Sequence, residues 1–231
     1  MKRHYRLHLK VDDAAKAAAP HLLLARVLRQ RYAHRQSPVI IAVGGPGGTG
    51  KTTFAARLAA ELPDARVLAL DDYKTPRETR ARKKVLGPHP LANEINLLKE
   101  HLTRLKRGES VAKPVYCRVK GRAAAARPFL PARFIIAEGE IATYRDFYDL
   151  VDFSIFIDSH WWTQLRTRIG RDILKRGYSA RKALLTFVRS NLLEFKTYGA
   201  ESRNWADVHI HCDRKYNLKL DAVCSRSAAL L

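Results

Sequence analysis

Short apolar runs alternate with longer amphipathic segments along most of this chain. The short runs are rich in valine, isoleucine and phenylalanine, which favours buried strands. Strands are expected at residues 37–43, 65–70, 133–140 and 150–158, and the short run "ADVHIHC" at 206–212 is expected to be the last strand. Apolar residues at helical spacing predict helices at residues 52–62, 91–108, 163–177 and 179–199. Alternating strands and helices are typical of an α/β domain with a mainly parallel central sheet.

The two ends of the chain lie outside this alternation. Residues 12–32 mix alanine and leucine with lysine and arginine, which predicts one or two helices, with Pro20 as a break or a first-turn residue. Residues 110–132 are expected to form short extended pieces and loop. The expected organisation is a helical N-terminal extension at 1–36, the alternating domain at 37–213 and a C-terminal tail at 214–231.

The turn between the strand at 37–43 and the helix at 52–62 reads "GGPGGTGKTT". It contains the pattern G-x-x-x-x-G-K-[ST], in which glycines let the backbone curl so that its N–H groups point at phosphate oxygens. The pattern predicts a nucleoside triphosphate site, with Lys51 at the β- and γ-phosphates and the Thr52 hydroxyl on Mg²⁺. The nucleotide-binding residues expected from this loop are Gly45, Gly47, Gly48, Thr49, Gly50, Lys51, Thr52 and Thr53.

The composition fits a globular protein but is strongly basic. Hydrophobic residues make up 46% of the 231 residues, and 43 basic residues against 22 acidic ones give a net charge of +21. Such a charge attracts polyanions, among them nucleic acids, anionic membranes and phosphorylated small molecules. No apolar run approaches the ~20 residues of a membrane span, and the three cysteines are scattered, which suggests reduced thiols. A cytoplasmic protein without a membrane segment is therefore expected.

Six segments after the loop add to this prediction. They are "VLALDDYKTP" (67–76), "GPHPLANEINLL" (87–98), "GESVAKPVYCRVKGR" (108–122), "FIIAEGE" (134–140), "RIGRDILKRG" (168–177) and "ADVHI" (206–210). In this order they resemble the uridine kinase/phosphoribulokinase family of P-loop kinases, over roughly residues 38–212. The resemblance implies a P-loop NTPase-type three-layer fold with a mobile, arginine-bearing lid. It also implies ATP- and Mg²⁺-dependent transfer of the γ-phosphoryl group to a hydroxyl of a small acceptor.

The resemblance assigns roles to residues at the expected strand ends. Asp71 is the expected catalytic base for the attacking hydroxyl, and Lys51 is catalytic as well as nucleotide-binding. Asp72 is the alternative base or a residue near Mg²⁺, and it borders the acceptor. Thr52 and Glu138 are the expected metal ligands. The plainer alternatives are a turn pair for the two aspartates and a strand-end carboxylate for Glu138.

The helix at 163–177 matches the lid pattern R-x-x-R-D-x-x-x-R-G. The resemblance assigns Arg171 to catalysis and Arg168 and Arg176 to the nucleotide. Closure of such a lid would bring guanidinium groups onto the transferring phosphoryl group. The plainer alternative is a solvated basic helix.

The acceptor side departs from the nucleoside kinase pattern. Pro88 stands where nucleoside kinases carry a ribose-binding aspartate, Gly121 where they place a histidine, and Tyr178 where they place an arginine. Lost hydrogen-bonding partners disfavour a nucleoside, and the basic segments 74–84 and 113–127 favour an anionic acceptor such as a sugar phosphate. The expected acceptor-binding residues are Asp72, Tyr73, His89, Tyr116, Arg118 and Arg122.

Several alternatives stay open. A nucleoside kinase of uridine or cytidine type is the second acceptor class, and the basic segments could instead form a solvated face. A nucleotide-dependent nucleic-acid-binding protein would also suit the charge, but no RNA-recognition, helix-turn-helix or zinc signature is present, so nucleic acid is not favoured as a partner. The sequence does not choose between ATP and GTP, and it leaves a homo-oligomer open.

Two residue pairs have an open role. Trp161 and Trp162 could stack on the nucleotide base, but packing between the lid and the core is the favoured interpretation. His209 and His211 share one face of their strand. They could form a metal pair, although ordinary strand-end histidines are favoured.

Overall fold

A computed structural model of the chain describes residues 8–10 and 19–224. The strands of its central sheet are β1 (His8–Lys10), β2 (Val39–Gly44), β3 (Ala65–Ala69), β6 (Phe134–Glu138), β7 (Phe153–Ser159), β8 (Val208–Cys212) and β9 (Leu218–Cys224). Their order across the sheet is β1-β9-β8-β7-β2-β6-β3. Strands β3, β6, β2, β7 and β8 pair in parallel, and β9 pairs antiparallel with β8 and β1. The mainly parallel sheet expected from the sequence is confirmed.

Helices connect most of these strands. The α-helices of the described chain are α2 (Pro20–Arg31), α3 (Lys51–Glu61), α4 (Arg77–Arg82), α5 (Ile95–Lys106), α6 (Trp161–Arg176), α7 (Ala180–Phe187) and α8 (Phe195–Tyr198). Short 3₁₀ turns are η1 (Leu70–Tyr73), η2 (Pro90–Ala92), η3 (Arg145–Phe147) and η5 (Ala200–Trp205), and η4 (Val188–Glu194) is a π-helical segment. Pro20 begins α2, where its missing N–H costs nothing. Residues 12–18 of the expected N-terminal helical region lie outside the described ranges.

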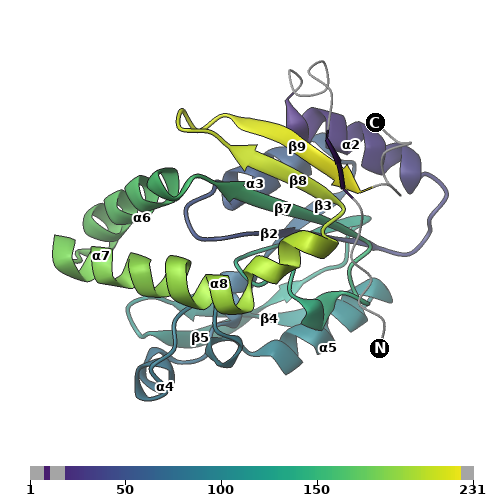
Figure 1. Cartoon of the computed structure of the whole chain (residues 1–231). Helices are drawn as coiled ribbons and strands as arrows, with labels where there is room; N and C mark the ends of the chain where they lie inside the picture. The colour runs from purple at the N-terminus through teal and green to yellow at the C-terminus, as the bar shows by residue number, and fades with distance from the viewer. Residues whose placement is uncertain (1–7, 11–18, 225–231) are drawn as a thin grey trace.

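Helices cover both faces of the sheet, which gives the three layers (Figure 1). Successive strand residues point to opposite faces, so Ile41 packs with α2 and α3 on one face while Ile40 packs with α5 on the other. Both isoleucines are fully buried. The continuous apolar run "VIIAV" of β2 follows from this double burial, and the expected three-layer α/β fold is confirmed.

Strands β4 (Val111–Cys117) and β5 (Arg122–Phe129) form a separate antiparallel hairpin. The extended pieces expected at 110–132 are therefore confirmed. Gly121 closes the hairpin with φ at 68°, in the left-handed region that favours glycine. Seven of the eight residues of β5 are exposed, so the hairpin extends from the domain as a largely solvated arm beside η1.

The sheet continues beyond "ADVHIHC". Strand β9 lies between β8 and β1 in the sheet, so the expectation that 206–212 is the last strand is wrong, and part of the segment 214–231 assigned to a tail is sheet. Leu220 and Val223 of β9 are 1% and 2% exposed and pack into the core beside α2 and α3. The sequence indicated this strand only through the alternation of Leu218 and Leu220 with polar neighbours.

The predicted helix at 179–199 is continuous but not uniform. It runs from α7 through the π-helical segment η4 into α8. Ser190 and Asn191 of η4 are buried, and π-helical turns often occur where a helix must present particular side chains.

None of the helices in the described ranges has the length and apolar character needed to cross a membrane.

Parallel pairing aligns the ends of the central strands at one edge of the sheet. Val43 of β2 and Ala69 of β3 both pair with Glu138, the last residue of β6. The glycine-rich loop follows β2, and Asp71 and Asp72 follow β3. The glycine-rich loop, Glu138 and the turn with Asp71 and Asp72 are thus brought to one edge, and ligands of open α/β sheets bind at this carboxyl edge.

The burial of β9 gives a test of the fold. We expect Leu220→Ala to lower the free energy of unfolding by about 2–5 kcal/mol, because it empties a fully packed site. Leu174→Ala on α6 is the matched control, since that leucine is 86% exposed and its change should stay within about 0.5 kcal/mol. Urea unfolding followed by circular dichroism measures both. Equal, small effects would show that β9 is not part of the packed domain.

Candidate active site

The glycine-rich loop connects β2 to α3, so the expected strand–loop–helix context is confirmed. Three of its glycines have positive φ, at 132° for Gly45, 87° for Gly48 and 86° for Gly50, where other residues are strained. At Gly45 a Cβ would also lie 2.0 Å from the carbonyl oxygen of Ile157 on β7. The loop is therefore held so close to the neighbouring strand that its first turn accepts only glycine.

Lys51 begins α3 and extends into the loop. Its side chain is largely buried, and Nζ donates to the carbonyl oxygen of Pro46 at 2.6 Å. The Thr49 hydroxyl donates to the same oxygen at 3.1 Å. Burial lowers the pKa of Lys51, and the carboxylates of Glu140 and Glu138 oppose this shift. The lysine amine thus lies among the loop amides, where a phosphate chain would meet both.

Thr52 and Glu138 lie together at the end of β6. The Thr52 hydroxyl donates to the Glu138 carboxylate, 3.2 Å from Oε2 and 3.3 Å from Oε1. Burial raises the pKa of Glu138, and the positive charge of Lys51 opposes that rise. Hydroxyl and carboxylate oxygens suit Mg²⁺, which is commonly held by one or two carboxylates together with substrate phosphates. The pair therefore offers two kinds of oxygen ligand that Mg²⁺ takes beside phosphate. Within the described ranges no group of three or more His, Cys, Asp or Glu residues could hold a metal.

Asp71 lies on the 3₁₀ turn η1, directly after β3. Its side chain is 62% exposed, and one carboxylate oxygen lies 3.0 Å from Lys74 Nζ. The positive charge of Lys74 lowers the pKa of Asp71 well below its usual range. Asp71 is therefore a carboxylate that remains ionised and is open to a second ligand.

Asp72 is committed differently from its neighbour. Its carboxylate pairs with Lys113 of β4 and accepts the backbone N–H of Tyr116 at 3.0 Å. These contacts attach the β4–β5 hairpin to η1. Asp71 thus pairs with Lys74 and lies near enough to Lys51 for that charge to lower its pKa as well. Asp72 instead positions the hairpin.

Arg168 of α6 lies against the glycine-rich loop. Its side chain is 7% exposed, its Nη1 lies 3.3 Å from Glu140 Oε1, and it also donates to Asn191 Oδ1. A Cβ on Gly47 would lie 2.5 Å from the same Nη1. The structure therefore brings Arg168 to the phosphate loop, as the lid assignment requires.

Arg171 and Arg176 make their ion pairs on α6 itself. Both approach the fully buried Asp172, at 3.5 Å and 2.9 Å. Arg168 also lies 3.9 Å from Asp172, so one carboxylate holds all three lid arginines in place. Phosphate contact by Arg171 and Arg176 stays a prediction.

Three residues that were not expected complete the site. Glu140 lies among Lys51, Lys74 and Arg168. Burial raises the pKa of Glu140, but the three cations together lower it by more, so the net shift is downward. Asn191 donates to the carbonyl oxygen of Gly47 at 2.8 Å and to Gln164 Oε1 at 2.9 Å. The only sequence signal was the position of Glu140 at the end of "AEGE" and of Lys74 after "LDDY". Asn191 gave none, because η4 meets the loop only in the tertiary structure.

The remaining acceptor candidates surround the hairpin and the loop before η2. Tyr116 Oη accepts from Arg80 at 2.5 Å and donates to the carbonyl oxygen of Gly121 at 2.8 Å. His89 accepts the Leu91 N–H at 3.1 Å, and its ring lies 4.4 Å from that of Tyr198. Arg118 and Arg122 are exposed at the two ends of the hairpin turn. They are displayed to solvent, so a role in binding the acceptor stays a prediction.

Tyr73 lies in the core rather than on an open surface, so its assignment to the acceptor site stays a prediction. Its side chain is 1% exposed, and its hydroxyl lies 2.8 Å from His101 Nδ1. Burial raises the pKa of Tyr73 and lowers the pKa of His101. The 3₁₀ turn η1 rotates Tyr73 into the layer beneath α5 while it leaves Asp71 on the surface.

The tryptophan pair does not pack between lid and core, so the favoured interpretation is wrong. Trp161 and Trp162 are 43% and 55% exposed, and their rings stack with centroids 4.1 Å apart.

The two histidines of β8 have separate partners. His209 Nε2 lies 2.7 Å from the Arg203 carbonyl oxygen, and His211 Nδ1 lies 2.8 Å from Asp158 Oδ1.

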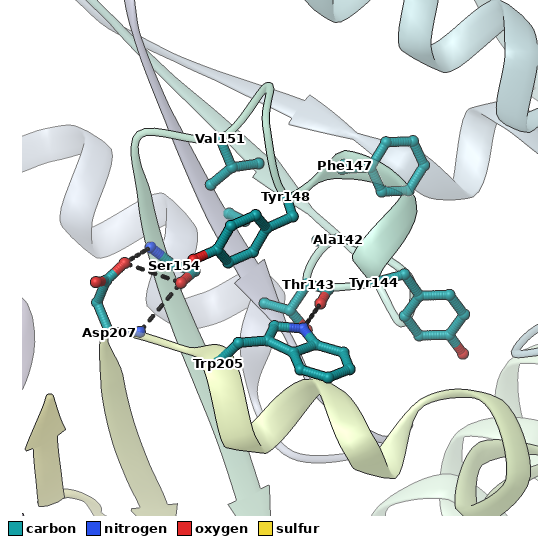
Figure 2. A pocket seen from close by; sticks show the side chains of 10 residues that line it. Ala142, Thr143, Tyr144, Phe147, Tyr148, Val151, Ser154, Trp205 and Asp207 are labelled. Atoms are coloured by element: carbon teal, nitrogen blue, oxygen red, sulfur yellow. Dashed lines mark hydrogen bonds between the residues drawn. The ribbon is translucent and has the colours of Figure 1, made fainter. Parts of the chain in front are cut away.

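A small cavity lies between the segment after β6 and the segment before β8 (Figure 2). Its volume is about 20 Å³, which is room for a single water molecule. Trp205 closes it with a hydrogen bond to the Thr143 carbonyl oxygen at 3.0 Å, and Asp207 accepts from Ser154 at 2.9 Å. The cavity is too small for a substrate, so the candidate site is the open sheet edge at the loop.

Comparison with known proteins shows the family to which the chain belongs. Residues 40–219 match the model of the phosphoribulokinase/uridine kinase family, and the chain belongs to that family. It is 30% identical over 176 residues to a phosphoribulokinase of Synechocystis sp., which covers 74% of this chain and 53% of the relative. The chain thus spans about half the length of the curated phosphoribulokinases that it matches.

Two further relatives match over nearly their whole length. A uridine kinase of Aeromonas hydrophila subsp. hydrophila is 30% identical over 208 residues, which is 85% of this chain and 97% of the relative. The solved structure of D-glycerate 3-kinase from Cryptococcus neoformans superposes with a TM-score of 0.65 at 14% identity, over 91% of this chain and 100% of that one. The last likeness concerns the fold alone.

The core position of Tyr73 is open to a direct test. We expect Tyr73→Phe to lower the free energy of unfolding by about 0.5–1.5 kcal/mol, since it removes one buried hydrogen bond. The control is Tyr216→Phe, because Tyr216 is 47% exposed and its change should stay within about 0.5 kcal/mol. Urea unfolding gives the stability. An acceptor KM that rises with no loss of stability would support the assignment of Tyr73 to the acceptor site.

Proposed function

We propose that this protein is an ATP-dependent, Mg²⁺-requiring kinase that transfers the γ-phosphoryl group to a hydroxyl of a small anionic acceptor. The observation that carries the proposal is the meeting, at one sheet edge, of Lys51 in the glycine-rich loop, the Thr52–Glu138 pair and the ionised Asp71. The relatives named phosphoribulokinase and uridine kinase are both named as kinases, which supports the proposal.

In the proposed reaction Asp71 receives the proton of the acceptor hydroxyl. Its lowered pKa makes it a weak base, but the transition state of phosphoryl transfer is loose and demands little proton abstraction before the bond to the donor breaks. The role of Asp71 is therefore mainly to orient the hydroxyl and to take its proton late. Lys74 keeps the carboxylate ionised and aligned.

Charge on the transferring group would be balanced by cations on three sides. Lys51 reaches from the loop, and Arg168 borders Gly47 from α6. Arg171 joins them if the lid moves toward the site. Mg²⁺, which Thr52 and Glu138 would hold, neutralises phosphate charge when bound. Preorganised charges of this kind supply the main part of catalysis in phosphoryl transfer.

An anionic acceptor is supported by the charge of the hairpin and of α4. Arg77 donates through its backbone N–H to Gly121 at 2.6 Å and through its side chain to the Arg118 carbonyl oxygen at 2.5 Å. These two contacts fix the hairpin turn to α4. The exposed Arg118 and Arg122 of the turn and the basic segment 74–84, which contains α4, therefore belong to one region of positive charge. A phosphate or carboxylate could form charge-assisted hydrogen bonds with such a surface.

The residues that would bind a nucleoside are replaced in a consistent way. Pro88 has no side-chain acceptor, and its carbonyl oxygen already accepts the Tyr144 hydroxyl at 2.7 Å. Gly121 has positive φ, and a Cβ there would lie 3.0 Å from the Arg77 Cβ, so a histidine would be strained. The nearly full-length match to a uridine kinase keeps the nucleoside kinase as the second candidate.

The proposal is tested by an acceptor screen. The protein is incubated with Mg²⁺–ATP and a panel of sugar phosphates, sugar acids and nucleosides, with and without RNA, and mass spectrometry detects acceptors that gain HPO₃. Lys51→Ala is the blank, because it lacks the loop ammonium. Phosphorylation of a sugar phosphate or sugar acid supports the proposal. ATP turnover that RNA stimulates, with no acceptor phosphorylated, would instead support a nucleic-acid-binding protein.

The two neighbouring aspartates should differ sharply in this assay. We expect Asp71→Asn to lower kcat by about 10²–10⁴-fold, the usual contribution of a general base, with little change in ATP affinity. Asp72→Asn should mainly raise the acceptor KM, because Asp72 positions the hairpin. Steady-state kinetics on both variants measures the difference. The reverse pattern would show that Asp72 is the base.

The charge of the acceptor gives a separate prediction. We expect the double variant Arg118→Gln/Arg122→Gln to raise the acceptor KM about tenfold, equivalent to about 1.4 kcal/mol, and to spare ATP affinity. The acceptor KM of the wild type should also rise with salt, because the Debye length falls from ~10 Å at 0.1 M to ~3 Å at 1 M.

The control for this pair is Arg26→Gln/Arg29→Gln on α2. It removes the same net charge from exposed arginines on the other layer of the domain, so the acceptor KM should stay unchanged. A KM that is indifferent to salt and to Arg118 and Arg122, with efficient phosphorylation of a nucleoside, would contradict the anionic acceptor.

A further inference from the structure

Two tryptophans at the first turn of α6 form an exposed aromatic surface that the proposed chemistry does not use. Trp161 and Trp162 stack with an interplanar angle of 24°, and both are exposed. Their neighbours in the same turn, Thr163 and Gln164, are 4% and 8% exposed. Two adjacent exposed indoles are unusual for a protein surface, since tryptophan is highly buried on average. Indole rings that keep a free face are suited to bind a flat aromatic ligand.

The first turn of α6 is attached to the glycine-rich loop. A Cβ on Gly48 would lie 3.0 Å from the Gln164 carbonyl oxygen. Gln164 donates to the Ser159 carbonyl oxygen at 2.8 Å, and Asn191 joins Gln164 to Gly47. Trp161 precedes Gln164 by one helical turn, about 5 Å along the axis. The tryptophans are therefore held at a fixed place next to the phosphate site.

The turn between β8 and β9 leaves the sheet at the same edge as α6. Ser159, just before α6, pairs with Cys212, which precedes this turn, so the two segments leave neighbouring strands at the same sheet edge (Figure 1). Asp213 closes the turn by accepting the N–H groups of Lys215 and Asn217. Leu218, at the start of β9, lies 3.9 Å from the Cβ position of Gly50. The loop end at Gly50 is thus bordered by the β8–β9 turn and by α6.

We propose that Trp161 and Trp162 are the stacking surface for the purine base of the donor nucleotide. The inference rests on the proposed function, because it assumes that the loop holds the phosphates of that nucleotide. With the β- and γ-phosphates at Lys51, the nucleoside must extend away from the acceptor side, toward the α6 and β8–β9 border. Stacking is nearly indifferent to the identity of a base, because every base has a π-face. The surface is therefore expected to bind adenine and guanine alike, so it contributes affinity for the nucleotide but no preference for ATP over GTP.

The test separates the base from the phosphates. Isothermal titration calorimetry measures the Kd of Mg²⁺–ATP, Mg²⁺–GTP and inorganic tripolyphosphate for the wild type, for Trp161→Ala and for Trp162→Ala. We expect at least one alanine variant to raise the Kd of both nucleotides by about 5- to 150-fold, which corresponds to the ~1–3 kcal/mol of a stacked base. The Kd of tripolyphosphate should not change. The matching Phe variant should recover most of the nucleotide affinity.

Tryptophan fluorescence gives a second readout. The chain has three tryptophans, and the third, Trp205, donates to Thr143 in the small cavity of Figure 2. Quenching by ATP should persist in Trp205→Phe and vanish in Trp161→Ala/Trp162→Ala. Unchanged nucleotide affinity in both alanine variants, or an equal loss for nucleotide and tripolyphosphate, would overturn the inference and leave the kinase proposal intact. A wild type that binds neither nucleotide nor tripolyphosphate would overturn both.

Discussion

The parallel pairing of β2 between β6 and β7 is the constraint on which the rest of the structure depends. It puts Val43 beside Glu138 and Gly44 beside Phe156, so the glycine-rich loop leaves the sheet where β6 ends and runs beside the last residues of β7. A register shift of one residue would move each strand's side chains to the opposite face. The loop would then lose its approach to Ile157, and Thr52 would lose Glu138. Packing of apolar residues on both faces fixes this register.

The buried charges around the loop depend on that alignment. Lys51, Glu138 and Glu140 are all largely withdrawn from water, and each would be costly alone. Arg168 and Lys74 complete a group in which every charge has an opposite neighbour. Such a group is sensitive to the arrival of a phosphate chain and a divalent cation, because both would change the balance.

The acceptor side is built on a different principle. The hairpin has little core of its own, and its position depends on polar contacts, chiefly Asp72 with Lys113 and Tyr116 and Arg77 with the hairpin turn. An arm held in this way can vary its charge without disturbing the sheet. Members of one family can thus keep the phosphate loop and change the acceptor, which agrees with relatives named phosphoribulokinase and uridine kinase.

The sequence by itself determined the alternation of strands and helices and the glycine-rich loop. Both are local, since burial on two faces requires an apolar run and a tight phosphate loop requires glycine at fixed spacing. It also placed Asp71, Thr52 and Glu138 at or near element ends that the sheet brings together, and Arg168 on a helix. Only the tertiary structure decided that Tyr73 is core and that Asn191 joins the loop, because a 3₁₀ turn and a π-helical segment set those directions. Strand β9 was missed for a similar reason: it becomes a strand by pairing with β8, a contact that its short alternating pattern signals only weakly.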